Sequence, residues 1–178
     1  MKEHQLQLEN IHISLEGKQL LALNAQIRGG EVLTVMGPSG VGKSSLLAYL
    51  AGFLAPVFKA SGLIRLDGEV INELPAEQRH VGLLFQDALL FPHLSVGGNL
   101  RFALPKTVQD KEARIEQALA SIGLAGFAER DPETLSGGQR SRVALQRLLL
   151  SEPKAVLLDE PFSRLDTHLR REVREFVF

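Results

Sequence analysis

The sequence predicts an α/β fold with a largely parallel sheet, because apolar segments of strand character alternate with segments of helical periodicity. Two local patterns support this prediction. A glycine-rich segment over residues 37–44 lies between an apolar run and a helix-forming run, and a second apolar run over residues 155–158 ends in two carboxylates. Ligands bind at the carboxyl ends of strands in such sheets, which makes both segments candidates for a binding site.

The elements are predicted from hydrophobic periodicity and from turn residues. Strands are expected over residues 5–15, 20–27, 31–36, 63–66, 81–85 and 155–158. Helices are expected over residues 43–51 and 111–122, after Gly138, and from Asp166 onward. Residues 87–136 combine helical periodicity with breakers such as Pro92, Gly97-Gly98 and Pro105, and we interpret this stretch as a helical insertion.

Composition limits the classes of function. The chain has 178 residues, in the range of one compact domain, and its formal net charge of -1 gives no support to a nucleic-acid partner. The absence of cysteine excludes disulfides, thiolate metal sites and thiol nucleophiles, and it fits a reducing compartment. The most apolar stretch, residues 46–58, is too short for a bilayer and is broken by Gly52 and Pro56, so a membrane role requires docking onto another chain.

A phosphate-binding loop is the first chemical motif. The run Gly37-Pro38-Ser39-Gly40-Val41-Gly42-Lys43-Ser44, followed by Ser45, matches G-x-x-x-x-G-K-[ST]. Glycines let main-chain N–H groups and a helix N-terminus face an anion, Lys43 adds a charge for the β- and γ-phosphates, and the Ser44 hydroxyl suits Mg²⁺. Small-molecule kinases, GTPases, helicases and transporter ATPases all carry such a loop, so the loop alone does not name the function.

An acidic pair follows the apolar run over residues 155–158. Four consecutive apolar residues suit a strand buried on both faces, and Asp159 then lies at its carboxyl end, where it can hold Mg²⁺ directly or through water. Glu160 points to the other side of the strand and can accept a proton from an attacking water. A solvated Asp-Glu at a strand end is the simpler alternative, and the upstream phosphate loop favours the functional interpretation.

A second anion site is indicated by Leu135-Ser136-Gly137-Gly138-Gln139. Ser136 caps a predicted helix, and the two glycines leave its first amides open. A serine-capped helix with a flexible entry is the alternative, but it does not explain why these five residues occur together.

With these motifs the sequence resembles the ATP-binding cassette family over essentially its whole length. The motifs occur in the family's order: the phosphate loop, Gln86 in the Q-loop, the signature over residues 135–139, the acidic pair, and Ser163-Arg164-Leu165-Asp166 as the D-loop. The resemblance implies a P-loop NTPase core with an N-terminal antiparallel β subdomain. Residues 1–86 and 137–178 would form this core, and residues 87–136 the helical subdomain.

The resemblance also implies a mechanism and partners. ATP would be sandwiched in a head-to-tail dimer between the phosphate loop of one subunit and the signature of the other, where Ser136 and Gly138 contact the γ-phosphate. Gln86 would bind Mg²⁺ or water and report to a coupling helix of a membrane permease, and Asp166 would connect the two sites. The segment over residues 84–96 is similar to that of importers, so a substrate-binding protein and a place at the cytoplasmic face of a bacterial inner membrane are expected.

Two departures from the family pattern matter. Ser14-Leu15 stands where the family has an aromatic residue that stacks on adenine, which predicts weak base recognition. The family's switch histidine lies about thirty residues beyond the catalytic glutamate, past Phe178, so we expect a chain that is cut short, and we give His168 no catalytic role. Because the strand with that histidine separates the strands over residues 32–36 and 155–158, we expect these two not to pair directly.

Three alternatives to a transport ATPase are open. An ABC ATPase that works without a membrane usually has two cassettes or long coiled-coil arms, and this chain has neither. A small-molecule kinase leaves the signature and the D-loop unexplained. A nucleotide-binding module without turnover is the third alternative.

Overall fold

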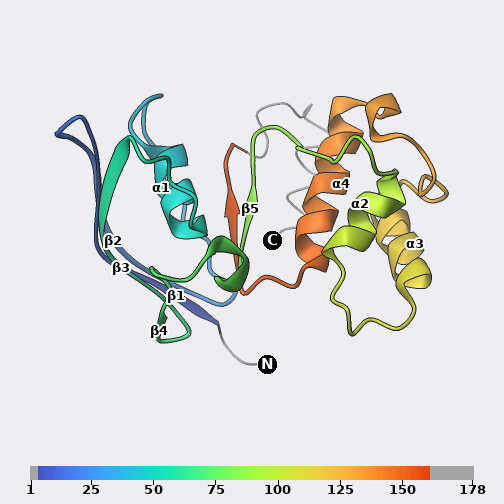
Figure 1. Cartoon of the computed structure of the whole chain (residues 1–178), viewed down its shortest axis with the longest axis horizontal. Helices are drawn as coiled ribbons and strands as arrows, with labels where there is room; N and C mark the ends of the chain where they lie inside the picture. The colour runs from blue at the N-terminus through green and yellow to red at the C-terminus, as the bar shows by residue number, and fades with distance from the viewer. Residues whose placement is uncertain (1–3, 161–178) are drawn as a thin grey trace. The chain divides into compact units, whose positions relative to one another are not determined.

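The computed structural model describes residues 4–160, which form two compact units (Figure 1). The first, here called the sheet unit, comprises the residues up to Leu83 together with Lys154–Asp159. The second, here called the helical unit, comprises Leu84–Pro153 and Glu160. The predicted D-loop with Asp166, the helix that begins there and His168 lie outside the described residues.

An antiparallel sheet forms one layer of the sheet unit. Its strands are β1 (Gln5–Leu15), β2 (Lys18–Arg28), β3 (Phe58–Leu66) and β4 (Glu69–Val70), in the order β2-β1-β3-β4. The strands predicted over residues 5–15, 20–27 and 63–66 are therefore confirmed, although β3 begins earlier than expected.

A β-bulge in β1 keeps one face of this strand apolar along its whole length. Leu6 and Leu8 are buried before the bulge and Ile11 and Ile13 after it. The register shifts between Leu8 and Ile11 against β2, and between Glu9 and His12 against β3. The bulge depends on Gly62 of β3, where φ is +102° and a Cβ atom would lie 2.4 Å from the carbonyl oxygen of Asn10.

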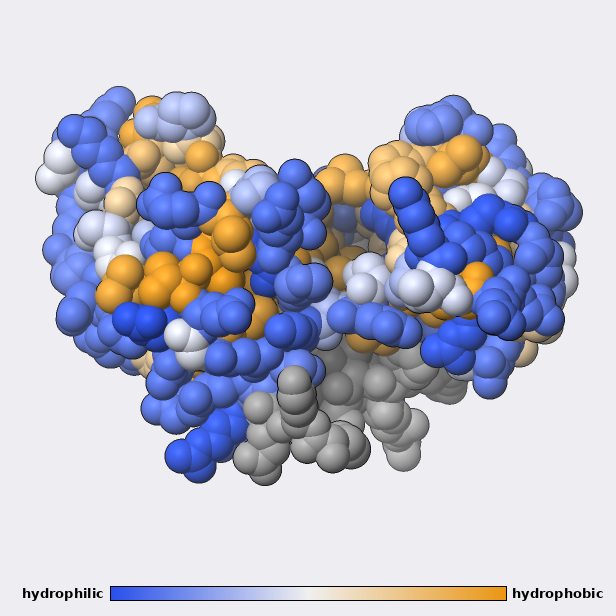
Figure 2. All heavy atoms as spheres, turned by 60° about the horizontal axis from the view of Figure 1, so that its bottom comes forward, coloured by the Kyte–Doolittle hydropathy of each residue, from blue (hydrophilic) through white to orange (hydrophobic). Residues whose placement is uncertain are grey.

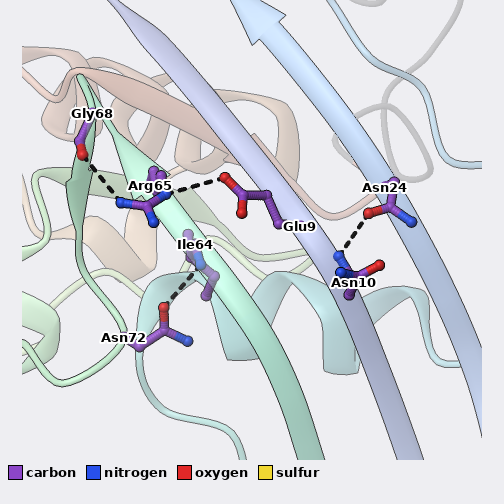
Figure 3. A network of polar contacts seen from close by, with 7 residues as sticks. All are labelled: Glu9, Asn10, Asn24, Ile64, Arg65, Gly68 and Asn72. Atoms are coloured by element: carbon purple, nitrogen blue, oxygen red, sulfur yellow. Dashed lines mark hydrogen bonds and ion pairs between the residues drawn. The ribbon is translucent and has the colours of Figure 1, made fainter.

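Polar side chains at the bulge and on the neighbouring strands join these strands by hydrogen bonds, as Figure 3 shows. The Asn10 amide donates to Asn24 Oδ1 on β2 at 2.6 Å, and Arg65 Nε on β3 donates to Glu9 Oε1 at 3.1 Å. The Ile64 amide donates to Asn72 Oδ1 at 2.8 Å. These bonds tie β1 to both of its neighbours and β3 to the segment that follows β4.

Helix α1 (Lys43–Ala51) packs its buried residues Leu46 and Leu50 into the same hydrophobic core as β1 and β3. The core also contains Leu157 of β6 (Ala155–Leu158), which pairs with β5 (Val81–Leu84) in a two-stranded parallel sheet. A short 3-10 helix, η1 (Ala76–Gln78), precedes β5.

Strand β6 is less buried than its sequence predicts. Leu157 is buried and Ala155 packs against the core, but Val156 between them is 39% exposed. Alternate residues of a strand face opposite sides, and the core of the sheet unit covers only the side of Ala155 and Leu157. The expectation of a strand buried on both faces was therefore wrong.

The strand predicted over residues 31–36 does not form. Within residues 4–160 this segment belongs to neither sheet, and Val32, Leu33 and Met36 are 60%, 47% and 87% exposed. A strand needs a hydrogen-bonded neighbour, and β6 pairs with β5 instead. Residues 32–36 and 155–158 do not pair directly, but the expectation of two separated strands is only half met, because the first of these segments is not a strand.

The helical unit contains α2 (Val96–Ala103), α3 (Lys111–Ser121), the 3-10 helix η2 (Pro132–Thr134) and α4 (Gly137–Leu150). Its core is a second cluster of buried residues that includes Val96, Leu100, Leu119, Leu124 and Val143. The predicted helices over residues 111–122 and after Gly138 correspond to α3 and α4.

Helix α2 was not predicted because Gly97-Gly98 was interpreted as a helix breaker. Both glycines lie in its first turn, where Ser95 Oγ accepts from the Gly98 amide at 3.1 Å. The Gly97 amide donates to the Ala128 carbonyl at 2.7 Å, and a Cβ atom at Gly97 would lie 3.1 Å from that oxygen. Gly97 thus allows a close approach of two backbones.

Hydrophobic residues also reach the surface of the sheet unit. On the face that Figure 2 shows, hydrophobic side chains lie among hydrophilic ones over this unit. By exposed fraction, the hydrophobic surface residues of this unit include Val57, Leu63 and Val70, with 58%, 40% and 42% of their surface exposed. None of the helices within residues 4–160 combines the length and hydrophobicity that a bilayer crossing requires.

We expect Asp67 to stabilise the sheet unit in a pH-dependent manner. Its Oδ2 atom lies 3.0 Å from His4 Nδ1 and 3.0 Å from Lys154 Nζ, and Oδ1 accepts from the Gln5 amide at 3.1 Å. Desolvation raises the pKa of Asp67, but the hydrogen bonds from Lys154, Gln5 and His4 outweigh it and lower the pKa from 3.8 to about 2. Stability from this depressed pKa is present above pH 3.8 and is lost as the pH falls towards 2.

Urea unfolding at several pH values between about 2.5 and 7 measures this contribution. Asp67→Asn should unfold more easily than the wild type at neutral pH and should lose less stability on acidification. Glu69→Gln, an exposed change in neighbouring β4, serves as the control. Parallel pH dependences for wild type and Asp67→Asn would contradict the prediction.

Candidate functional site

The phosphate loop is shaped by its lysine and its glycines. Lys43 Nζ donates to the carbonyl oxygens of Gly37 at 2.7 Å and Pro38 at 2.9 Å, so the ammonium group spans the loop that precedes its own helix. Gly40 and Gly42 have φ angles of +82° and +98°, which side-chain-bearing residues rarely adopt. The segment over residues 37–42 therefore curves around the lysine and leads directly into α1.

The amino end of α1 is left without a side-chain cap. Gly42 occupies the N-cap position, no side chain accepts from the first turn, and no acidic residue lies there. The first amides of a helix and its dipole together attract an anion, and the exposed Ser44 adds a hydroxyl group. The arrangement suits a phosphate group, with Lys43 as the counter-charge.

The acidic pair follows β6 directly. Asp159 is partly buried, whereas Glu160 is exposed and has a φ of +46°. Strand β6 and helix α1 pack into one core through Leu157 and Leu46, so Asp159 and the phosphate loop belong to the same compact unit. Within residues 4–160 no cluster of three or more histidine or acidic residues is arranged to hold a metal ion.

The predicted second anion site is the amino end of α4. Ser136 Oγ accepts from the Gln139 amide at 3.2 Å, and Gln139 Oε1 accepts from the Ser136 amide at 2.9 Å. This reciprocal pair is a capping box, and it fixes the point at which α4 begins. Leu135 is buried in the helical core, while the amides of Gly137 and Gly138 are not used by the cap.

Gln86 shares a cavity with the signature. A hollow of about 310 Å³ in the helical unit is lined by the segment from Gln86 to Leu90 and by residues near the amino end of α4, among them Glu133, Gly137 and Arg140. Of the five predicted signature residues, Gly137 lines this hollow together with Gln86. The phosphate loop lies in the other unit.

Two residues of this unit that sequence reasoning missed are Asn99 and Arg147. Asn99 is fully buried in α2, accepts from the Phe91 amide at 2.8 Å, and donates to the carbonyls of Phe91 at 3.1 Å and Ser95 at 3.0 Å. Arg147 Nη2 donates to the Leu89 carbonyl at 3.0 Å, and burial lowers the pKa of its guanidinium group. Together they hold the loop that follows Gln86.

Because α2 was not predicted, nothing in the sequence singled out Asn99, and nothing distinguished Arg147 from the other arginines of α4.

Comparison with known proteins assigns the family. The family described as ABC transporter matches residues 20–163, which include the phosphate loop, the signature and the acidic pair. The chain belongs to the ABC transporter ATP-binding family. Membership makes the chain an ATP-binding protein with ATPase activity, and it confirms the resemblance seen in the sequence.

Relatives within the family include import proteins. The chain is 49% identical over 174 residues to the uncharacterized ABC transporter ATP-binding protein YnjD of Escherichia coli (strain K12), covering 96% of this chain and 80% of that protein. It is 42% identical to the thiamine import ATP-binding protein ThiQ of Vibrio vulnificus (strain YJ016), covering 97% and 73%. With the spermidine/putrescine import ATP-binding protein PotA of Vibrio cholerae it shares 42% identity, covering 95% of this chain but 45% of PotA.

A solved structure shows the fold. A bacterial Atm1-family ABC exporter with ATP bound superposes on 98% of this chain and 32% of its own chain with a TM-score of 0.80 and 24% sequence identity. The predicted α/β class, with an antiparallel N-terminal sheet, a parallel sheet and helices, is confirmed. The predicted division into core and helical subdomain at residues 86 and 137 stays a prediction.

The capping box should stabilise the helical unit. We expect Ser136→Ala to lower the free energy of unfolding by about 1 kcal/mol, because the Gln139 amide loses its acceptor. Urea unfolding monitored by circular dichroism measures the change. Ser39→Ala, in the exposed phosphate loop, is the control and should leave stability nearly unchanged. Equal stability of Ser136→Ala and wild type would contradict the importance of the cap.

The base of the nucleotide should be weakly selected. Ser14 lies near the end of β1, between Gln19 of β2 and Lys59 of β3, and it offers no ring for stacking. We expect ATP and GTP to bind with affinities within about tenfold, or 1.4 kcal/mol. Calorimetric titration of both nucleotides under identical conditions tests this. Ser14→Tyr should increase the preference for ATP, and a strong preference for ATP in the wild type would disprove the prediction.

Proposed function

We propose that this chain is the ATP-hydrolysing subunit that energises a membrane ABC importer and that it works as a head-to-tail dimer. One observation carries the proposal: a single chain has two helix N-termini whose first amides no side-chain cap uses. One is the start of α1 beside Lys43, and the other is the start of α4, where the capping box of Ser136 does not use the amides of Gly137 and Gly138. Each chain of a dimer then supplies the phosphate loop of one ATP site and the signature of the other.

The residues present fit ATP and Mg²⁺. The phosphates bind main-chain N–H groups within residues 39–45, and Lys43 exchanges its carbonyl contacts at Gly37 and Pro38 for the β- and γ-phosphates. Mg²⁺ is usually held by one or two protein oxygens together with phosphates, so the absence of a larger acidic cluster within residues 4–160 does not count against it. We assign Ser44, Asp159 and Gln86 as its protein ligands.

Hydrolysis requires a base and a positioned water. Glu160, exposed at the end of β6, accepts the proton of the water that attacks the γ-phosphorus, while the bond to the β-phosphate oxygen breaks and ADP leaves. Gln86 orients that water. Leu135, Ser136, Gly137, Gly138 and Gln139 complete the site of the partner subunit, and Asp166 connects the two sites.

The cavity beside Gln86 is a candidate docking site for a membrane permease. A hollow of about 310 Å³ lined by Gln86, Leu89 and Glu133, with its loop held by Asn99 and Arg147, offers a shaped seat for a helix of a membrane permease. Relatives named as import proteins support an importer, which adds a substrate-binding protein and a location at the cytoplasmic face of the bacterial membrane. In this proposal residues 87–136 are the subdomain that contacts the permease.

A second candidate function is a nucleotide-binding module with little or no turnover. The observation that favours it is the segment over residues 31–36, which leads into the phosphate loop without being part of a sheet. A loop that is less firmly held still binds phosphate but positions it less well for attack. Steady-state ATPase assays separate the two candidates, since only the first predicts turnover.

Lys43 and Glu160 should separate binding from chemistry. We expect Lys43→Ala to abolish ATP binding, because it removes the phosphate counter-charge and two contacts that shape the loop. Glu160→Gln should keep ATP affinity within about twofold, lose hydrolysis, and favour an ATP-bound dimer. Calorimetry, phosphate release and size-exclusion chromatography with ATP measure the three properties. Lys106→Ala and Glu129→Gln, both exposed, are the matched controls. Equal loss of ATP affinity in Lys43→Ala and Glu160→Gln would refute this division of roles.

A further inference from the structure

The phosphate-loop helix α1 is fixed at its carboxyl end by a buried arginine. Arg79, which follows η1, is 6% exposed, and within the described residues its hydrogen bonds go only to main-chain carbonyls. Nη1 donates to Tyr49 at 2.9 Å and to Leu50 at 3.1 Å, both in the last turn of α1. Nε donates to Leu74 at 2.8 Å, and Nη2 donates to Asn72.

The position of Arg79 has a clear electrostatic reason. The last carbonyls of a helix have no partner inside the helix and carry the negative end of its dipole, so a cation there is favourable. The guanidinium group has five N–H donors in one plane, and this geometry lets it reach two carbonyls of α1 and two carbonyls of the segment before β5 at once.

A neighbouring tyrosine strengthens the same end of α1. Asn72 Nδ2 donates to Tyr49 Oη at 3.0 Å and to the Gly62 carbonyl at 3.0 Å, and Asn72 Oδ1 accepts from the Ile64 amide, the contact drawn in Figure 3. Tyr49 thereby joins α1 to β3 while Arg79 joins it to the segment over residues 72–74. Both contacts lie inside the sheet unit.

Glycine at position 52 makes room for this arrangement. A Cβ atom at Gly52 would lie 2.7 Å from Arg79 Nε and 2.9 Å from Cζ, and the φ angle there is +93°. Gly68 has a similar φ of +85°, but a Cβ atom there would meet nothing within 4 Å. The two glycines share the backbone strain of a substitution and differ only in the collision with Arg79.

We propose that Arg79 is a positioning residue for ATP binding: it holds the carboxyl end of α1 so that the uncapped first turn, with Lys43 and Ser44, faces the phosphates. The amino end of α1 cannot be fixed by a side-chain cap without occupying the amides that the phosphates need. The helix is nine residues long, so a tilt at its carboxyl end moves its first turn as well. This inference rests on the phosphate-loop assignment proposed above.

The two glycines provide the test. Gly52→Ala should weaken the affinity for ATP about tenfold, the effect of losing one charge-assisted hydrogen bond to a phosphate. Gly68→Ala should stay within about twofold of the wild type. Isothermal titration with ATP measures both variants, and urea unfolding shows how far each loses stability. Equal ATP affinities for the two variants would overturn the proposal.

Arg79 variants and a readout of position complete the experiment. Arg79→Lys keeps the positive charge but loses the planar set of guanidinium donors. Its affinity for ATP should therefore lie between those of the wild type and Arg79→Met. Hydrogen–deuterium exchange of the peptide over residues 37–46 without ATP should speed up in Gly52→Ala and in both Arg79 variants. Ile13→Val, a buried change in β1, is the control for a general loss of stability. In this variant, exchange of the peptide over residues 37–46 should stay as in the wild type. Unchanged exchange in all three variants would refute the positioning role.

The outcome also separates this inference from the proposed function. If Lys43→Ala keeps its ATP affinity, the phosphate-loop assignment fails. If Lys43→Ala loses ATP while Gly52→Ala binds like Gly68→Ala, the assignment stands and the role of Arg79 fails. Should Arg79→Met not fold, the comparison of the two glycine variants still decides.

Discussion

The structure depends on one requirement: the first amides of α1 must stay free of protein partners. A helix end without a side-chain cap gives up stability that caps usually provide, so the helix has to be held by other contacts. Here those contacts are the packing of Leu46 and Leu50 into the core and the hydrogen bonds of Arg79 and Tyr49 at the opposite end. Lys43 meanwhile occupies the loop carbonyls, which keeps the loop open and its charge in place.

The second helix N-terminus meets the same requirement in a different way. Helix α4 has a capping box, but Ser136 uses only the Gln139 amide, so the amides of the two glycines before it are left for a ligand. Its stability therefore comes partly from its own cap, and Leu135 anchors the entry in the helical core. In the dimer proposed above, this end would contact the nucleotide of the other subunit, so it would have to keep its shape before the two subunits meet, and a local cap would provide that.

The chemistry of the site was easier to predict from sequence than its mechanical support. Phosphate-loop, signature and acidic-pair motifs are short, so their residues lie together by covalent connection, and the strands and helices around them follow from periodicity. Arg79 and Arg147 reach main-chain carbonyls of Tyr49 and Leu89, which lie 30 and 58 residues away in sequence. Asn99 bonds the carbonyl of Phe91, eight residues before it. Such bonds leave no pattern in the residue order. Two predictions failed where a partner decided the outcome. Residues 31–36 found no neighbouring strand. Helix α2 includes two glycines in its first turn, where the Gly97 amide bonds the Ala128 carbonyl and the Gly98 amide bonds Ser95.

The bulge at Asn10 has a consequence for how β1 can evolve. Before it the even-numbered residues Leu6 and Leu8 face the core, and after it the odd-numbered Ile11 and Ile13 do. Ser14 is therefore in the outward phase of the strand only because the bulge takes up one extra residue upstream. If β1 kept its length but lost the bulge, strict alternation would turn Ser14 towards the core and Ile13 towards water, so the side chain offered to a base at the end of β1 is set by a backbone irregularity several residues away. A one-residue deletion at the bulge would preserve the alternation on both sides, whereas a one-residue insertion or deletion between Ile11 and Ile13 would break it.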